Sequence, residues 1–206
     1  MNIKFDDISS SEAYFMMTQT IVPRPIAWVL TENKNVDTYN LAPFSYFNAI
    51  CSNPPLVVMS VGKTPKGEDK NTRVNIINNK RLVIHIANVN HAEAVTETSR
   101  GLPYGESELD QIDMKLVQDE GWSLPRLVDV DVAMECEFYD LHEIGPNEQA
   151  VFYCEIKLLH VSDRCVSVDE KGRKVIDAAC LNSLGRLGPN QYVSFGEVIQ
   201  ISQPAL

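Results

Sequence analysis

The stretch Asp131–Asp163, DVAMECEFYDLHEIGPNEQAVFYCEIKLLHVSD, decides the fold. Two long runs rich in β-branched and aromatic residues flank Gly145-Pro146-Asn147-Glu148, which predicts an antiparallel hairpin. In the second run the even-numbered residues from Phe152 to Leu158 are apolar, and the odd-numbered residues between them are more polar. One face of the hairpin is therefore expected to lie in the core and the other to meet water at least in part.

Further strands are expected on both sides of this hairpin. Ile26–Thr31 reads as a strand, Leu56–Val61 and Arg81–Ala87 read as buried strands, and the turn Asp169–Gly172 joins a shorter pair. At 206 residues we expect one mainly β (β+α) domain over 1–206.

The N-terminal segment 1–22 is expected to form a helix that packs on the domain. Ser9 and Glu12 have the spacing of a capping box, and Tyr14, Met17 and Ile21 share one face of the helix that follows.

Charge and composition exclude several classes of protein. The net charge of −10 and the pI near 4.8 argue against a surface for nucleic acid or anionic lipid. No apolar run approaches the ~20 residues of a membrane span, and the first residues lack the pattern of a secretory leader. We expect a cytoplasmic protein that binds neither nucleic acid nor membranes.

The cysteines and histidines form no recognisable site. The 5 cysteines are odd in number and scattered, which argues against a disulfide framework and favours core side chains. His85 and His160 lie in strand-like runs, where a hydrogen-bonded histidine without a metal is the commoner case. No metal site is therefore predicted.

The loop between Ser60 and Asn75 has the opposite charge sign to the chain. It holds four basic and two acidic side chains, a local charge of 4 − 2 = +2. Asn71 or Thr72 is expected to cap the next helix, whose N-terminus offers free N–H groups to an anion. The alternative is a solvated loop, which is the better interpretation for Lys66.

Asn40–Phe47, NLAPFSYF, is expected to be irregular because Pro43 interrupts a strand ladder. A bulge that brings backbone close to something flat and an edge strand with a kink both fit this pattern. Arg24 lies between two prolines and Arg186 between glycines, so each is either a solvated arginine or a constrained contact to an anionic or planar ligand.

Four segments together, PRPIAWV, NLAPFSYFNAICSNPPLVVMSVG, KNTRVNI and GRLGPNQY, resemble the flavin reductase-like family, particularly its flavoredoxin-like branch. The resemblance implies a six-stranded antiparallel Greek-key split barrel with peripheral helices, and a homodimer with FMN near the interface. It departs from the family at Asn71, where aspartate is common, and at Pro189, where glycine is common. These departures put only the loop around Arg186 in doubt.

By this resemblance, Asn40–Ser45 lines the isoalloxazine ring, and Ser60–Lys63 with Lys70–Thr72 holds the ribityl phosphate. The expected cofactor-binding residues are Arg24, Asn40, Leu41, Ala42, Pro43, Phe44, Ser45, Ser60, Val61, Gly62, Lys63, Lys70, Asn71, Thr72 and Arg186.

The function implied is an FMN-dependent oxidoreductase, with NADH or NADPH as transient reductant and free flavin, oxygen or a partner protein as acceptor. No catalytic side chain is expected, because flavin carries the electrons itself. Two alternatives remain: a non-enzymatic FMN-binding or electron-transfer protein, and a barrel that has lost flavin. No GxGxxG fingerprint for a nicotinamide nucleotide is present.

Overall fold

The computed structural model describes residues 1–34, 37–202 and 204. Its strands are β1 (Ala27–Glu32), β2 (Tyr39–Phe44), β3 (Phe47–Ser52), β4 (Pro55–Val61), β5 (Arg81–Ile86), β6 (Leu116–Val117), β7 (Arg126–Leu127), β8 (Val132–Ile144), β9 (Gln149–Val161), β10 (Val166–Val168), β11 (Lys174–Ile176), β12 (Gly185–Arg186) and β13 (Tyr192–Val193). The α-helices are α1 (Ser10–Thr20), α2 (Asn71–Asn79), α3 (Ala92–Glu97) and α4 (Ala178–Leu181). The 3-10 helices are η1 (Phe5–Asp7), η2 (Val89–His91), η3 (Glu108–Gln111) and η4 (Asp163–Cys165).

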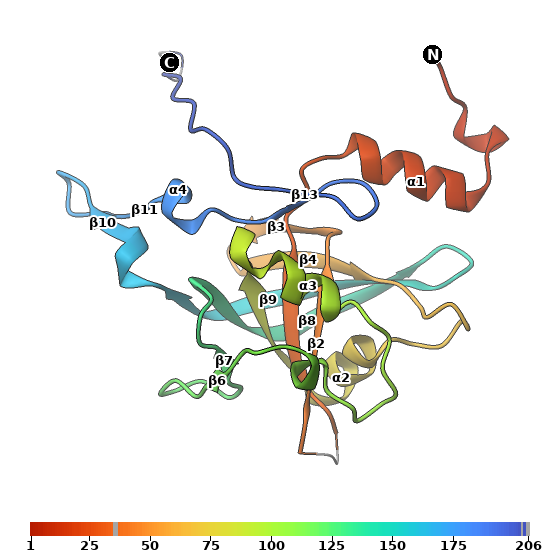
Figure 1. The fold of residues 1–206 in the computed structure, drawn as a ribbon, viewed down its shortest axis with the longest axis horizontal. Coiled ribbons are helices and arrows are strands. Elements are labelled where there is room, and N and C mark those ends of the chain that lie inside the picture. Colours follow the sequence, from red (N-terminus) through yellow and green to blue (C-terminus); the bar gives the residue numbers. More distant parts are fainter. Residues whose placement is uncertain (35–36, 203, 205–206) are drawn as a thin grey trace.

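A seven-stranded antiparallel sheet forms the centre of the molecule (Figure 1), in the order β2-β1-β5-β8-β9-β4-β3. The predicted hairpin is confirmed as β8 and β9, which are 13 residues long each. Its turn contains Gly145 and Glu148 in the left-handed region, at φ 73° and 49°. Strand β8 pairs with β5 over residues 132–137 and with β9 along its whole length, where the ladder shifts register twice.

Two apolar cores lie on opposite faces of this sheet. One gathers alternate residues of β1, β4, β5, β8 and β9 around Phe152, with Ile76 of α2 packed into it. The other surrounds Trp28, which donates its indole N–H to Thr98 Oγ1 at 2.8 Å, and is closed by α3 and the segment 109–127. Strand β1 contributes to both cores, so it is buried on both faces.

The split-barrel prediction is confirmed, but the expected number of six strands was wrong. Strand β3 lies largely in a stretch for which no strand was predicted. FNAICS has no apolar alternation to mark it as a strand, and 5 of its 6 residues are exposed. Strand β3 is held by its ladder with β4 rather than by burial.

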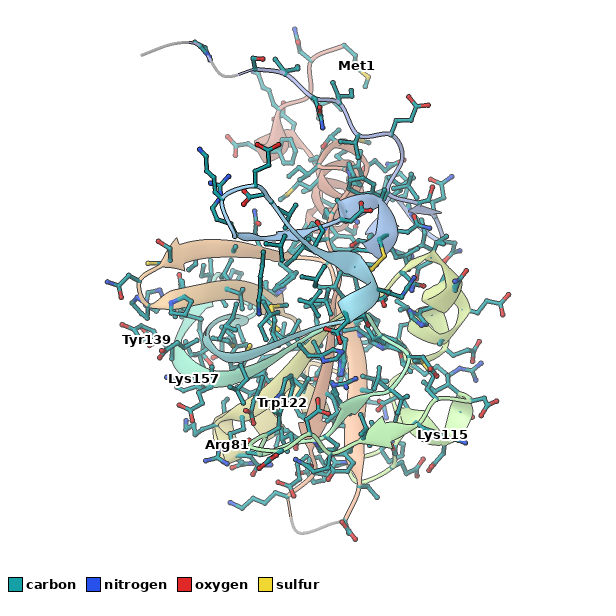
Figure 2. All side chains as sticks on the ribbon, turned by 90° about the vertical axis from the view of Figure 1, so that its left-hand side faces the viewer. Met1, Arg81, Lys115, Trp122, Tyr139 and Lys157 are labelled. Carbon is teal, nitrogen blue, oxygen red and sulfur yellow. A yellow bond between two sulfur atoms is a disulfide. The ribbon has the colours of Figure 1, made fainter. Side chains whose placement is uncertain are left out.

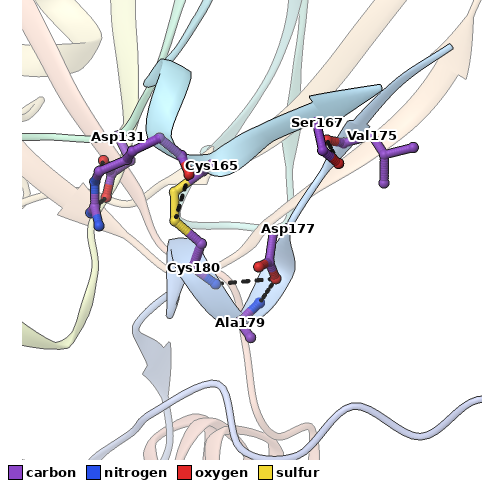
Figure 3. The surroundings of a disulfide bond; sticks show 8 residues. Asp131, Cys165, Ser167, Val175, Asp177, Ala179 and Cys180 are labelled. Atoms are coloured by element: carbon purple, nitrogen blue, oxygen red, sulfur yellow. Dashed lines mark hydrogen bonds and ion pairs between the residues drawn. A yellow bond between two sulfur atoms is a disulfide. The ribbon is translucent and has the colours of Figure 1, made fainter. Parts of the chain in front are cut away.

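The expectation of no disulfide was also wrong. Cys165 and Cys180 are bonded, with their Cα atoms 5.5 Å apart (Figure 3). The β10–β11 hairpin reverses the chain between them, and Asp177 donates its N–H to the Cys165 carbonyl at 2.9 Å. Cys136 and Cys154 are core residues as expected, whereas Cys51 is exposed.

The N-terminal helix begins where the sequence predicted. Ser9 Oγ accepts a hydrogen bond from the Glu12 N–H, and the Glu12 carboxylate accepts one from the Ser9 N–H, as in a capping box. Among the described residues Thr18 is the one buried residue of α1, and Tyr14 and Met17 are exposed, although the Tyr14 ring lies 6.3 Å from the Tyr46 ring. The packing of 1–22 on the domain stays a prediction. None of the helices in the described ranges is long and apolar enough to cross a bilayer.

Candidate functional site

The N-terminus of α2 is open. Lys70 occupies the N-cap position with extended backbone angles and makes no capping bond through its side chain. The expected caps Asn71 and Thr72 were therefore wrong, because both already lie inside the helix. The first helical bond runs from the Val74 N–H to the Lys70 carbonyl at 3.1 Å. Among the described residues nothing accepts from the three N–H groups before Val74, so they and the positive end of the helix dipole are available to an anion.

The Lys70 ammonium lies beside this helix end without a counter-charge. Its Nζ is 5.7 Å from the centre of the Phe44 ring and forms no ion pair with any described residue. Although the side chain as a whole is exposed, atoms crowd its charged end, and this desolvation lowers the pKa of Lys70. An anion bound here would restore a partner to a partly dehydrated cation.

Lys63, in contrast, is already paired. Its Nζ lies 2.7 Å from Glu148 Oε2 and 3.7 Å from Asp69 Oδ1. The pair raises the pKa of Lys63 and lowers that of Glu148. Glu148 lies in the β8–β9 turn, so Lys63 joins this turn to the loop before α2. As a phosphate ligand it would have to share its charge with a carboxylate.

Arg73 fixes the other side of the same helix end. Its guanidinium is paired with Glu143, donates to the Glu148 carbonyl at 2.8 Å and lies 3.3 Å from Asp69. The Arg73 side chain is almost fully enclosed, so the first turn of α2 is bound to the hairpin. Of the four basic residues of the loop, Lys63 and Arg73 are therefore paired with protein carboxylates, whereas Lys66 and Lys70 form no ion pair with a described residue.

A hydrogen bond joins the two stretches that the sequence assigned to ring and phosphate. Asn40 Nδ2 donates to Thr72 Oγ1 at 2.9 Å, and both side chains are buried. One turn further on, Asn75 donates to Thr31 Oγ1 at 3.1 Å and to Asn33 Oδ1 at 2.8 Å. Thr72 is only 1% exposed, so in this structure its hydroxyl binds Asn40 of β2 and connects the first turn of α2 to the sheet.

Of the two interpretations left open for 40–47, the edge strand is confirmed, but the irregularity expected within it was wrong for β2. All six residues of β2 pair in register with β1, and Pro43 lies opposite Trp28. Proline is tolerated because β2 is an edge strand, where the missing N–H can face away from the ladder. The chain leaves the ladder only at Ser45, after which Tyr46 accepts a hydrogen bond from the Ser60 N–H at 2.8 Å.

The side chains of the predicted ring and phosphate segments point in different directions. Leu41 and Val61 are core residues with no exposed surface, and Ala42 packs against the core around Phe152. Phe44 faces Lys70, and Ser45 Oγ accepts from Arg24 Nε at 3.4 Å. A planar ligand along this stretch would meet mostly backbone.

The end of β4 opens into a cleft of about 570 Å³ between the 62–67 loop and the β8–β9 turn. Ser60 Oγ accepts from Gln149 Nε2 at 2.7 Å. A Cβ added at Gly62 would lie 3.1 Å from Gln149 Oε1, so the absence of a side chain there allows the close approach.

The two predicted arginines are brought together, but through their backbones. The Arg24 N–H donates to the Arg186 carbonyl at 2.9 Å, and the reverse bond is 2.8 Å. The Arg24 guanidinium is buried and donates to the carbonyls of Thr18, Ile21 and Leu187, so it holds α1 and the 187 loop together. The Arg186 guanidinium stacks on the Tyr192 ring with its Cζ 4.6 Å from the ring centre.

Glu108 was missed by sequence reasoning, which found no role for 101–121. Its carboxylate is 2% exposed and accepts the Leu41 N–H at 2.9 Å, covering the open edge of β2. Burial raises the pKa of Glu108 despite that bond. The one available signal was the local sequence SELDQI, which forms η3; the position of Glu108 against β2 could be known only from the sheet order.

His85, expected to be a hydrogen-bonded histidine, is fully buried and makes two hydrogen bonds. His85 Nε2 accepts the Leu127 N–H at 3.0 Å, so Nδ1 carries the hydrogen donated to the Trp28 carbonyl at 3.0 Å. Burial lowers its pKa to about 4. No group of three or more potential metal ligands occurs in the described part of the chain.

Comparison with known proteins identifies the family of this fold and site. Residues 17–168 match the family described as flavin reductase like domain. An uncharacterized protein of Halalkalibacterium halodurans is 31% identical over 208 residues, covering 100% of this chain and 98% of that protein. The chain belongs to the flavin reductase-like family, as its sequence motifs predicted.

Two solved structures are similar over nearly the whole chain. Nitrilotriacetate monooxygenase component B from Bacillus cereus superposes with a TM-score of 0.87 at 30% identity, covering 98% of both chains. The 2-nitrobenzoate 2-nitroreductase from Pseudomonas fluorescens gives 0.85 at 25% identity, covering 99% of this chain and 96% of its own. The likeness extends over the long β8–β9 hairpin and the helix that follows β4.

Proposed function

We propose that this protein is an FMN-dependent oxidoreductase that accepts hydride from NADH or NADPH and passes electrons to free flavin, oxygen or a partner protein. The observation that carries the proposal is the pairing of a cation without a counter-charge, Lys70, with the uncapped N-terminus of α2. A terminal phosphate matches both, since it is dianionic and takes several N–H donors at once.

The ring end of the cofactor fits the neighbouring segment. Asn40–Ser45 runs from the Asn40–Thr72 bond to the Arg24–Ser45 contact, so one rigid strand connects the phosphate site to the loop that Arg24 anchors. Bound FMN would supply the hydride and electron chemistry. The chain itself would bind the phosphate, orient the ring along β2 and limit water through the loop carrying Arg186.

The proposed nicotinamide reductant has no dedicated binding motif in the sequence, and the oxidoreductase chemistry is supported by two similar structures. No glycine-rich nucleotide fingerprint is present in the sequence, so a nicotinamide would stay only during turnover. A monooxygenase component and a nitroreductase are among the similar structures, which supports oxidoreductase chemistry. We also propose a homodimer with the flavin near its interface, because the Arg24–Ser45 region adjoins the exposed helix α1.

Substitution of Lys70 tests the phosphate site. Lys70→Ala removes one charge-assisted contact worth roughly 1.5–3 kcal/mol, so the Kd for FMN should rise roughly 10- to 150-fold. Lys66→Ala is the matched control, because Lys66 lies exposed in the same loop and forms no ion pair with a described residue. Equal affinities of the two variants would place the phosphate elsewhere.

The activity is tested with the unmodified protein. Its visible spectrum is recorded with added FMN, and oxidation of NADH and NADPH is then followed under air. Bleaching of a yellow protein by either nucleotide is expected. A yellow protein that bleaches only with dithionite would favour the electron-transfer alternative. A protein that stays colourless with added FMN would exclude both flavin functions.

A further inference from the structure

Arg186 is a half-buried cation that the fold leaves without an acceptor. Among the described residues its guanidinium takes part in no hydrogen bond and no ion pair, and only its backbone is bonded. The other arginines that are buried or half-buried, Arg24, Arg73 and Arg126, all donate to carbonyl or carboxylate oxygens. Donors that are removed from water without an acceptor cost free energy. A ligand from outside the chain would supply the missing acceptor.

The Arg186 side chain is held in place by an aromatic ring. Its Cζ lies 4.6 Å from the centre of the Tyr192 ring, and that ring packs against the core around Trp28. The Tyr192 hydroxyl donates to Thr96 Oγ1 at 3.0 Å, because Thr96 donates its own hydrogen to the Ala92 carbonyl. A guanidinium stacked on a ring keeps its N–H groups at its edges. The stack therefore fixes the position of these donors without using them.

The backbone of Arg186 is constrained as well. It pairs with the backbone of Arg24 in both directions, and β12 pairs with β13, which lies beside the C-terminal end of α1 (Figure 1). A Cβ at Gly185 would lie 2.9 Å from Pro23 Cβ and from Val193 Cγ1, so this close approach requires a glycine. Arg186 is therefore kept at the side of Arg24.

This position adjoins the ring end of the proposed flavin site. Arg24 Nε donates to Ser45 Oγ at 3.4 Å, and Ser45 follows the last residue of β2. Burial lowers the pKa of the Arg24 guanidinium, and the nearby charge of Arg186 lowers it further. Within the described ranges no carboxylate pairs with either cation. The two charges together attract an anion, and Arg186 is the one with free donors.

FMN itself does not account for this second cationic position. It has a single phosphate group, which the proposed function assigns to Lys70 and the N-terminus of α2. A nicotinamide dinucleotide must bring its nicotinamide against the flavin ring, and it also carries a pyrophosphate. The sequence has no GxGxxG fingerprint to bind that pyrophosphate with backbone N–H groups. A chain of net charge −10 repels such an anion, so a local cation is needed to bind it.

We propose that the Arg186 guanidinium binds a phosphate group of the nicotinamide dinucleotide whose nicotinamide ring meets the flavin beside Ser45. The planar fork of arginine suits phosphate, which accepts two parallel N–H groups. Tyr192 is then a positioning residue, because it acts on the ligand only through Arg186. The identity of the ligand rests on the proposed function. The phosphate belongs either to the pyrophosphate of NADH and NADPH or to the 2′-phosphate of NADPH alone, and the experiment distinguishes these two sources.

Steady-state kinetics of Arg186→Gln are the first test. At saturating FMN, the KM for the dinucleotide should rise about 10-fold or more, while kcat and the Kd for FMN change by less than about 2-fold. A rise for NADH and NADPH alike identifies the pyrophosphate, and a rise for NADPH alone identifies the 2′-phosphate. Arg81→Gln is the matched control and should change none of these values. Arg81 also has no ion pair with a described residue, but it lies at the end of the molecule away from Met1 (Figure 2).

Binding without turnover gives a second readout. ADP-ribose, which carries the pyrophosphate, and adenosine 2′,5′-bisphosphate are each titrated by calorimetry into the protein with FMN. The Kd of the probe that matches the kinetic result should rise about 10-fold in Arg186→Gln, and Arg186→Lys, which keeps the charge but not the fork, should lie between. Tyr192→Leu should raise KM and leave kcat unchanged, whereas Tyr192→Phe, which keeps the ring, should behave as the native protein. The Tm of each variant shows whether it is folded.

The outcomes separate this proposal from the proposed function. Native KM values and native probe affinities in a folded Arg186→Gln overturn it. A weaker FMN affinity with unchanged KM for both dinucleotides also overturns it, because Arg186 would then be a ligand of FMN. If the native protein neither binds FMN nor oxidises a dinucleotide, the proposed function fails, and the titrations still decide whether Arg186 binds a phosphate. If Arg186→Gln does not fold, Arg186→Lys and Tyr192→Leu carry the same test through their KM.

Discussion

Glu108 allows a sharp test of how the sheet edge is maintained. Its carboxylate accepts the N–H of Leu41, a residue without exposed surface, at 2.9 Å. Glu108→Ala would leave that donor buried and unpaired, at a cost of about 1–3 kcal/mol in the free energy of unfolding. For a chain of 206 residues each kcal/mol lowers Tm by about 2–4 °C, so a decrease of roughly 2–12 °C is expected.

Glu108→Gln separates the acceptor from the charge. The amide oxygen can still accept the Leu41 N–H, but the side chain no longer titrates. Burial raises the pKa of Glu108 above its ordinary 4.5, so the folded protein binds a proton more readily than the unfolded chain. Its contribution to stability is therefore full below pH 4.5 and is lost as the pH rises through the folded pKa.

Calorimetry and urea unfolding between pH 4.5 and 7 measure both effects. The native protein should gain stability relative to Glu108→Gln as the pH falls toward 4.5, and Glu108→Ala should be the least stable at pH 7. An alanine variant that unfolds with the native protein at pH 7 would refute the role given to this carboxylate. Parallel pH profiles of the native protein and the glutamine variant would refute the raised pKa.

Two further predictions concern stability. The pKa of His85 is about 4 in the folded protein, against 6.5 in the unfolded chain. As the pH drops below 6.5 the unfolded chain binds a proton at His85 and the folded protein does not, so the free energy of unfolding decreases. The loss between pH 7 and 5 should be about 2 kcal/mol by urea unfolding, and His85→Gln should remove most of that slope; an unchanged slope would contradict the burial of a neutral ring. Cys165→Ser with Cys180→Ser opens a loop of sequence separation 15, which should cost about 3 kcal/mol and lower Tm by roughly 6–12 °C in calorimetry. In a strong thiol reductant the native protein should have the same Tm as this variant. A variant with the Tm of the oxidised protein would show that the disulfide does not stabilise the fold.

The elements that could be predicted carry their signal locally. The β8–β9 hairpin has its turn between two strand-like runs, and the capping box of α1 needs only residues three apart. The family motifs, as a pattern over the whole chain, added the split barrel, whereas the cofactor-binding residues that they imply stay a prediction. For these elements, short-range chemistry and the native structure agree.

The features that were missed depend on distant partners. Pro43 left a bulge and a kinked edge strand open, and only the sheet order shows that β2 is an edge strand. Lys63 stays a predicted phosphate ligand, but its pairing with Glu148, 85 residues further along the chain, could not be predicted. Cys165 and Cys180 meet because β10 and β11 fold back between them. Sequence spacing alone contains none of these contacts.

The burial of β1 between two cores limits how this protein can evolve. Ala27 and Val29 belong to the core around Phe152. Trp28 and Leu30 belong to the other core, which surrounds the Trp28 indole ring. A surface strand would accept polar replacements at every second position, but this one has no permissive position from Ala27 to Thr31. Sequence change should therefore be tolerated in the surrounding loops rather than in β1.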